Sequence, residues 1–255
     1  MTSVRVVGAH AAVRHDGVDD EVAVEEPLEI RVGGEAIAVT MRTPGDDEAL
    51  ALGFLCGEGL IDGPRPAAPA ADLAANVVEV GGPLVRAPAT RRFYTSSSCG
   101  VCGKGALDEV AVQAAPLPEG PVLPRTLLAA LPDRLRQPEF ERTGGLHATG
   151  LFDAGGTLLL AREDVGRHNA MDKVIGQALL DGLVPLHGHV LCVSGRLSFE
   201  LVQKAAVAGA PVLVGVGAPT SLAVSLAEDR GLTLCGFARA GRVNVYAGAE
   251  RVRGA

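Results

Sequence analysis

Apolar residues recur along this chain in two different spacings. Residues 27–41, PLEIRVGGEAIAVTM, alternate apolar and polar positions around Gly33 and Gly34, which predicts a β-hairpin. A helix is predicted from about Asp46, because Asp46 is a favourable N-cap residue and acidic side chains fill the first turn. After a weak first strand, the N-terminal part is therefore expected to form a small ββα unit.

Two proline-rich segments divide the chain. Residues 63–72, GPRPAAPAAD, and residues 116–124, PLPEGPVLP, are typical of links between elements. Strands are predicted between the two links, near residues 76–80 and 92–95. We expect two domains, a small N-terminal β-hairpin and helix roll over residues 1–90 and a main domain over residues 91–255.

Short apolar runs alternate with helical patterns beyond the second link. Strands are predicted for LHATGLF, TLLLARE, HVLCVSG, VLVGVG, LTLCGFA and VNVYAG. Helices are predicted for residues 167–180, 197–208 and 220–229, where apolar residues recur every three or four positions. This alternation predicts an α/β (α+β) fold in which helices cover a sheet.

The segment 205–227 carries no charged residue and is long enough to cross a membrane. It contains Pro211, Pro219 and several glycines, and its pattern changes from a short apolar run to helical spacing. We therefore assign it to a buried strand followed by an amphipathic helix, and we expect no membrane association.

Composition excludes several classes of function. The chain has 255 residues, 47% of them hydrophobic, which describes a globular protein. Its net charge of -7 and its 3% aromatic content, with no tryptophan, argue against a nucleic-acid-binding surface. The 5 cysteines are an odd number, and the first residues lack the apolar run of a secretion signal, so we expect a cytoplasmic location.

The most unusual stretch is YTSSSCGVCGKGALDEV, which contains Cys99 and Cys102 in front of a helix-like segment. Unsatisfied N–H groups at a helix N-terminus favour a thiolate over a thiol, and Lys104 adds a cation nearby. Glycines at 100, 103 and 105 allow a bulky partner to approach the backbone closely. The pair is a candidate for nucleophilic chemistry, and a pair of structural thiols is the alternative.

A zinc site at this pair would need further ligands. No second CxxC is present, and Cys56, Cys192 and Cys235 stand singly among apolar neighbours. No histidine is followed at the second position by glutamate, so the zinc deaminase motif is absent. We predict no metal, whereas a thioredoxin-type dithiol stays open.

A second polar cluster is REDVGRHNAMDK, residues 162–173. Residues placed at 100° intervals bring Asp164 and His168 onto the stripe of the apolar residues Met171, Ile175 and Leu179. We favour the interpretation that this pair faces a ligand pocket. A helix cap at Asp164 and a satisfied buried pair are the alternatives.

Three further segments suit an anionic ligand. The loops SGRLS, beginning at Ser194, and GVGAPTS follow strands and open helices, where backbone donors meet anions. In FARAGR, Phe237, Arg239 and Arg242 offer an aromatic ring and two guanidinium groups to a nucleotide base and its phosphates. Ordinary tight turns and a solvated sheet edge are the competing interpretations.

Together, the CGVCG loop after SSS, TGGLHATGL, REDVGRHNAMDK, SGRLSFE and GFARAGRVNVY resemble the formate dehydrogenase accessory sulfurtransferase (FdhD) family. The similarity runs from about Glu26 to the end of the chain, with the five motifs in order. The Pro/Ala-rich segment near Pro64 is not required by the family pattern. The resemblance implies a homodimer with a cytidine-deaminase-like main domain, a three-layer mixed sheet with flanking helices, that carries no zinc.

The resemblance also implies a function. Such proteins take sulfur from a cysteine desulfurase as a persulfide and deliver it to the bis-molybdopterin guanine dinucleotide cofactor that formate dehydrogenase needs. The family's reactive cysteine corresponds to Cys99, with Cys102 as its companion. The family's cofactor-binding segment corresponds to Phe237, Ala238, Arg239, Ala240, Gly241 and Arg242, and we add Asp164, His168 and Ser194 from the pocket motifs. A dithiol oxidoreductase and a cofactor-binding chaperone without catalysis are the alternatives.

Overall fold

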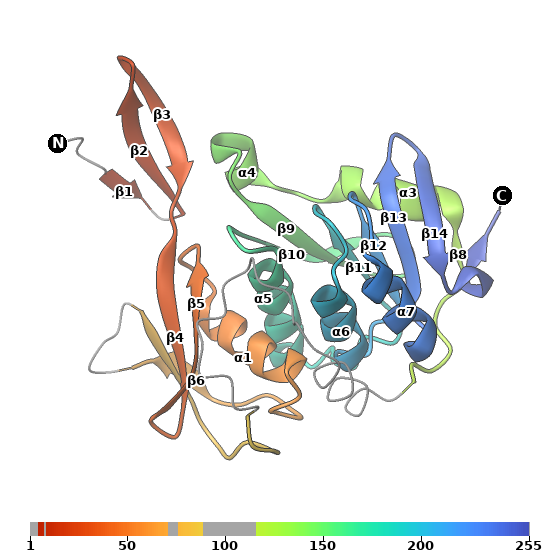
Figure 1. Cartoon of the computed structure of the whole chain (residues 1–255), viewed down its shortest axis with the longest axis horizontal. Helices are drawn as coiled ribbons and strands as arrows, with labels where there is room; N and C mark the ends of the chain where they lie inside the picture. Colours follow the sequence, from red (N-terminus) through yellow and green to blue (C-terminus); the bar gives the residue numbers. More distant parts are fainter. Residues whose placement is uncertain (1–4, 8, 71–75, 89–115, 255) are drawn as a thin grey trace.

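The computed structural model describes residues 5–7, 9–70, 76–88 and 116–254 (Figure 1). Within these ranges, the largest sheet has 6 strands in the order β10-β9-β11-β12-β13-β14. Its strands β11, β12 and β13 are parallel, and the outer pairs are antiparallel. In chain order its strands are β9 (His147–Phe152), β10 (Leu158–Asp164), β11 (Val190–Val193), β12 (Val212–Gly215), β13 (Thr233–Arg239) and β14 (Arg242–Ala247).

Helices cover both faces of this sheet (Figure 1). On one face lie α5 (Arg167–Leu180), α6 (Phe199–Val207) and α7 (Ser221–Arg230), and on the other lies α3 (Arg125–Arg134). The alternation within β11 produces these layers, because Leu191 and Val193 pack in the core under α5–α7 while Val190 and Cys192 pack in the core under α3. The predicted α+β class and its three-layer mixed sheet are confirmed.

The uncharged segment forms a buried strand followed by a helix that is exposed on one side, as predicted. It contains the end of α6, strand β12, which is buried at every position, and the start of α7. None of the helices in the described ranges has both the length and the apolar content that a membrane crossing requires.

The N-terminal part contains a second sheet of 4 strands in the order β5-β4-β7-β6. The predicted hairpin is confirmed, because β4 and β5 pair antiparallel and Gly33 and Gly34 both have positive φ angles at the turn. The predicted helix is confirmed as α1. The prediction that residues 63–72 form a plain link is wrong, because Ala70 donates to Val77 O at 2.9 Å and part of the segment becomes an edge strand. The elements are β4 (Glu26–Val32), β5 (Glu35–Arg42), α1 (Asp47–Gly57), β6 (Ala67–Pro69) and β7 (Val77–Val80).

Asp46 occupies the N-cap position of α1 without capping it. Its φ angle is 55°, in the left-handed region, and its side chain accepts no capping hydrogen bond. Instead the carboxylate lies 3.1 Å from Nε of Arg162 on β10. The residue was therefore placed correctly, but its predicted capping role is wrong.

Several elements escaped the sequence pattern. The single weak first strand is in fact a three-stranded meander, which the pattern missed because most side chains of its last strand face solvent. Helices α3 and α4 also lie where no helix was predicted. The unpredicted elements are β1 (Arg5–Val7), β2 (His10–His15), β3 (Val18–Ala23), β8 (Leu123–Pro124), α3, α4 (Pro138–Thr143) and β15 (Val252–Arg253).

Helices α1 and α5 are in direct backbone contact. A Cβ atom added to Gly53 would lie 1.8 Å from the carbonyl oxygen of Asp172, and one added to Gly176 would lie 1.8 Å from that of Ala49. Both positions accept only glycine, so this helix pair has one register. The same hydrophobic core includes Leu50 of α1 and Ile175 of α5. The domain boundary near residue 90 stays a prediction.

Candidate functional site

The loops that follow β11 and β12 and the end of β13 are joined side by side at one edge of the main sheet. Gly217 donates to Gly195 O at 3.0 Å, and Phe237 donates to Gly217 O at 3.1 Å. A Cβ atom on Gly217 would lie 2.9 Å from the backbone of Arg196, so the loops can approach this closely only with glycine here. This carboxyl edge is where open sheets of parallel strands bind ligands.

Ser194 links the carboxyl edge to the start of β9. Its hydroxyl oxygen accepts from Ala148 N at 2.9 Å, and its own N–H donates to Ala148 O at 2.9 Å. These two bonds place His147, the first residue of β9, beside Gly195. The predicted residue Ser194 is thus at the edge, and its hydroxyl already accepts one hydrogen bond from the protein.

His168 lies in the first turn of α5 and faces the start of α6. Its Nε2 atom is 3.2 Å from the Ser198 hydroxyl and 3.8 Å from the Glu200 carboxylate, with 17% of the side chain exposed. Burial and the charges of Arg167 and Lys204 lower the pKa of His168, whereas Glu200 raises it. The contact with His168 in turn lowers the pKa of Glu200 to about 2.

Positive charge gathers around this contact. Burial and the neighbouring charge of Arg196 lower the pKa of Arg167, and the Arg167 Nε atom is buried with no hydrogen-bond partner in the described ranges. Burial, Arg167, His168 and Arg196 lower the pKa of His147. The hydroxyl of Thr149, two residues after His147 on β9, is also buried without a hydrogen-bond partner among the described residues. Two arginines held close together and two polar atoms without partners are the features of an anion site.

Sequence reasoning did not assign His147, Thr149, Arg167 or Arg196 to the site. His147 and Thr149 lie at the start of β9, which runs antiparallel to β11 and so brings its start beside the end of β11. The sequence does not reveal this pairing. A local signal existed for Arg196, which stands in the predicted SGRLS loop.

Asp164 is placed differently from the prediction. It lies at the end of β10, two residues before Gly166, which is the N-cap of α5, so the helix-cap alternative is wrong. Its side chain is fully buried, and its oxygens accept from Gly166 N, Asn169 Nδ2 and Thr43 N at 2.8, 3.0 and 3.1 Å. Asp164 is therefore satisfied in the core, but by these groups and by Lys173 and not by His168, so the two residues do not form the predicted pair. A role of Asp164 in cofactor binding stays a prediction.

The segment from Phe237 to Arg242 forms the hairpin between β13 and β14. Ala240 and Gly241 have φ angles of 48° and 72°, as a tight two-residue turn requires. Phe237 has a φ angle of 52° and is 37% exposed, and the Arg239 guanidinium lies 6.0 Å from the centre of its ring. Ala238 is buried, whereas Arg239 and Arg242 are exposed and have no carboxylate partner within the described residues. A ring and two guanidinium groups are therefore available to a ligand.

The cysteines separate into two groups. Cys56, Cys192 and Cys235 are free and buried. Burial raises the pKa of Cys56 to about 11 and that of Cys235 to about 12, and it raises the pKa of Cys192 further. Cys99 and Cys102 lie outside the described residues. No three histidine, cysteine or acidic side chains within those ranges lie close enough together to share a metal ion.

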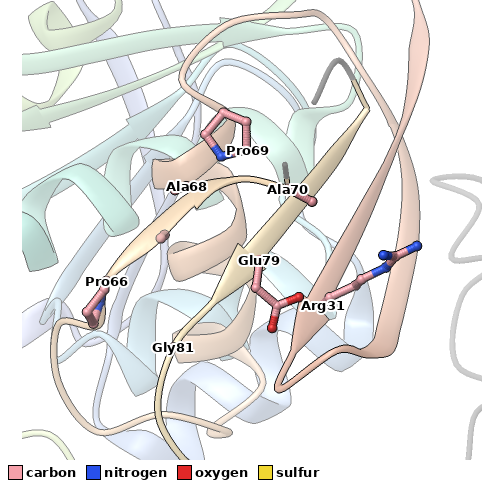
Figure 2. Close-up of a pocket in the computed structure, with 8 residues that line it drawn as sticks. Arg31, Pro66, Ala68, Pro69, Ala70, Glu79 and Gly81 are labelled. Carbon is pink, nitrogen blue, oxygen red and sulfur yellow. The ribbon is translucent and has the colours of Figure 1, made fainter. Parts of the chain in front are cut away.

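One large pocket lies away from the carboxyl edge. It has a volume of about 570 Å³ and is lined by Arg31, Glu79, Gly81 and the segment 66–70 (Figure 2). None of the predicted site residues lines it.

A three-layer α+β protein with a candidate anion site at the carboxyl edge of its sheet is the class that this geometry defines. The chain belongs to the FdhD/NarQ family, whose model matches residues 23–253. The resemblance drawn from the five motifs is thereby confirmed.

Relatives and a solved structure support this assignment. The chain is 53% identical over 247 residues to a protein of Nocardia farcinica named "Sulfur carrier protein FdhD", with 92% of this chain and 88% of that protein covered. A protein of Streptomyces coelicolor with the same name is 53% identical over 251 residues, covering 91% and 89%. The crystal structure of a putative formate dehydrogenase accessory protein from Desulfotalea psychrophila has a TM-score of 0.76 and 27% identity, and 99% of each chain is covered.

Proposed function

We propose that this chain is a cytoplasmic sulfur carrier. It accepts sulfur from a cysteine desulfurase as a persulfide on Cys99 and delivers it to the bis-molybdopterin guanine dinucleotide cofactor of a formate dehydrogenase. The names of the relatives, "Sulfur carrier protein FdhD", and of the solved accessory protein support the general role. The persulfide, the donor and the cofactor are part of the proposal.

The state of the other thiols is the observation that carries this assignment. A thiolate is the nucleophile in sulfur transfer, and a thiol with a raised pKa in an apolar core is inert. Cys56, Cys192 and Cys235 are buried and have raised pKa values. By elimination, the reactive thiol belongs to the glycine-rich CGVCG segment, at Cys99 or Cys102.

Loading is a balanced exchange of sulfur bonds. The Cys99 thiolate attacks the terminal sulfur of the donor's persulfide, a new S–S bond forms, and the donor's cysteine leaves as a thiolate. In delivery, Cys102 either accepts the sulfur in the same way or attacks the Cys99 sulfur and releases hydrosulfide. The second route leaves a disulfide that a cellular dithiol must reduce.

The molybdenum cofactor is the substrate in this proposal, and the carboxyl edge fits its chemistry. Its diphosphate groups are anions, and the unpartnered Arg167 Nε and Thr149 hydroxyl supply buried donors for them. Phe237 and Arg239 offer a ring and a cation that suit a guanine base. Ser194 and His168 border the same edge, which supports their place in the predicted cofactor site.

The remaining partners follow from the role. A carrier must meet a donor and an acceptor, so we propose a cysteine desulfurase and formate dehydrogenase as transient partners. We also propose a homodimer, the assembly that the family resemblance implies.

Mass spectrometry of the intact chain tests this function. Incubation with a cysteine desulfurase and free cysteine should add about 32 Da, the mass of one sulfur atom, for each transferred sulfur. Cys99→Ala should abolish this gain, whereas Cys56→Ala should keep it. A loss of about 2 Da in the wild type, together with no gain of mass in Cys102→Ala, would instead indicate a dithiol oxidoreductase, because a carrier without Cys102 keeps the persulfide on Cys99. No change in mass would indicate a chaperone with incidental thiols.

A further inference from the structure

Helix α5 packs against two other helices, α1 and α6, and the two contacts differ in kind. Helices α1 and α5 meet through Gly53 and Gly176, whose backbones leave no room for a side chain. Helices α5 and α6 meet less closely. Between α5 and α6 lies a buried ion pair, Asp172 of α5 and Lys204 of α6.

Groups from α1 and α5 closely surround the Lys204 ammonium of α6. The Lys204 Nζ atom donates to both carboxylate oxygens of Asp172, at 2.7 and 2.9 Å, and both residues are buried. The same ammonium lies 5.4 Å from the centre of the Phe54 ring on α1. A Cβ atom on Gly57 would already touch Lys204 Cγ at 3.0 Å. Three helices therefore converge on this one contact.

A buried ion pair is weak evidence for stability, because desolvation offsets much of the attraction between the charges. It is stronger evidence for register, since only one relative position of the two helices keeps both charges paired. Sliding α6 along α5 by one turn, about 5.4 Å, would leave two buried charges without partners. The pair thus selects one position of α6.

This position determines the geometry of the carboxyl edge. Asp172 lies one turn after His168 on α5, and Lys204 lies one turn after Glu200 on α6. The helices therefore make two polar contacts. His168 contacts Glu200 and Ser198 at the N-terminal ends of the helices, and Asp172 pairs with Lys204 one turn further along both. If α6 shifts at the Asp172–Lys204 pair, the contact of His168 with Glu200 and Ser198 shifts as well.

We infer that Asp172 and Lys204 form a positioning pair that fixes the N-terminal turns of α5 and α6 at the ligand-binding edge. This inference rests on the proposed function, because that function makes His168 and Arg167 part of the edge that meets the cofactor. The groups that face His168 are Arg167 on its own helix, Glu200 and Lys204 on α6, and His147 on β9.

Two measurements test the pair. In Asp172→Leu/Lys204→Met, an apolar pair replaces the charges, so the fold should survive with a similar urea midpoint. The affinity for GDP, measured by calorimetry as a probe of the nucleotide end, should fall about tenfold, the loss expected for one misplaced charge-assisted hydrogen bond. Affinity within about twofold of the wild type would overturn the inference.

A second variant tests the inference if Asp172→Leu/Lys204→Met does not fold. Asp172→Asn/Lys204→Gln removes the charges with little change of shape. If the pair positions the helices, the contact of His168 with Glu200 should loosen in this variant. Because Glu200 raises the pKa of His168, that pKa should then fall when the imidazole is titrated by NMR, whereas loss of the Lys204 charge alone should raise it. A His168 pKa that rises or stays unchanged, together with unchanged GDP affinity, would overturn the inference.

A matched control separates positioning from general loss of a buried pair. Arg42 and Asp47 form another ion pair, with two bonds of 2.9 Å between the N-terminal sheet and α1, in which Arg42 is buried and Asp47 is 24% exposed. Arg42→Met/Asp47→Leu should change neither GDP affinity nor the His168 titration, and an equal effect there would overturn the inference. If the wild type itself does not bind GDP, the proposed cofactor site fails, while the gain in mass still tests the sulfur-carrier role and the direction of the His168 pKa change still decides the positioning role.

Discussion

The Lys173 Nζ atom lies 2.8 Å from the Asp164 carboxylate, and both side chains are almost completely buried. Lys173 also donates to Thr43 O at 2.8 Å, while Thr43 N donates to Asp164 at 3.1 Å. The pair therefore ties the connection between β5 and α1 to the start of α5. Since a buried charge without its partner is costly, this contact connects the N-terminal sheet to the main sheet energetically.

Breaking this pair is expected to destabilise the chain strongly. Asp164→Ala should lower the free energy of unfolding by about 3–5 kcal/mol, because it leaves the Lys173 ammonium buried and unpaired. The double variant Asp164→Leu/Lys173→Met should lose less than the sum of the single variants. Urea unfolding followed by circular dichroism gives these values.

The control for this prediction is an exposed pair. Glu250 lies 3.0 Å from Arg251 and is 70% exposed, so Glu250→Ala should leave the urea midpoint unchanged. If Asp164→Ala keeps its stability and instead loses affinity for GDP, the carboxylate lines the ligand pocket, as the sequence pattern had indicated.

The three buried cysteines are expected to be unreactive in the folded state. In Cys99→Ala/Cys102→Ala, iodoacetamide at pH 8 should modify none of Cys56, Cys192 and Cys235, because their raised pKa values leave almost no thiolate at that pH. In urea all three should react, and intact mass counts the adducts. Rapid modification of Cys56 in the folded protein would weaken the assignment of sulfur transfer to the CGVCG segment.

Much of the fold was predictable because its pattern is local. The bounds of α5 agree with the predicted residues 167–180, since each turn buries an apolar face against the same sheet. The meander of β1, β2 and β3 was not predictable in this way. Most side chains of β3 stay in solvent, so no clear alternation of burial marks that strand.

The candidate site was predictable only in part, for a related reason. Residues that end a strand or begin a helix, such as Ser194 and His168, are visible as motifs. Asp164 carries the same kind of signal, but its partner Lys173 turns it into a buried ion pair. His147 joins the edge through an antiparallel strand pairing, a long-range contact that no local spacing reveals.

Glycine at the contact of α1 and α5 is expected to be essential. Gly53→Ala would place a methyl group 1.8 Å from the Asp172 carbonyl oxygen, so the helices must separate. We expect a loss of about 3 kcal/mol or more in the free energy of unfolding. Gly63→Ala is the matched control, because nothing lies within 4 Å of its added methyl group. Equal stability of the two variants would mean that α1 does not approach α5 this closely.

The last prediction is that ligand binding and sulfur loading are separable. Arg239 and Arg242 are exposed at the hairpin of β13 and β14, whereas the proposed persulfide forms on Cys99. Arg239→Ala and Arg242→Ala should each weaken GDP binding about tenfold, because each removes a charge-assisted hydrogen bond to phosphate. Phe237→Ala should also weaken it, through the loss of stacking on the base. Sulfur loading should be unchanged in all three variants.

Arg253→Ala is the control for a general loss of positive charge, since Arg253 is exposed on β15 outside the predicted segment. Its GDP affinity should equal that of the wild type. If Arg239→Ala and Arg242→Ala also bind GDP like the wild type, the hairpin is a solvated sheet edge. The nucleotide would then have to be held by the residues of the carboxyl edge, and Arg167→Ala should weaken GDP binding. A hairpin variant that loses sulfur loading as well would instead mean that the donor enzyme contacts this edge, which contradicts separate sites.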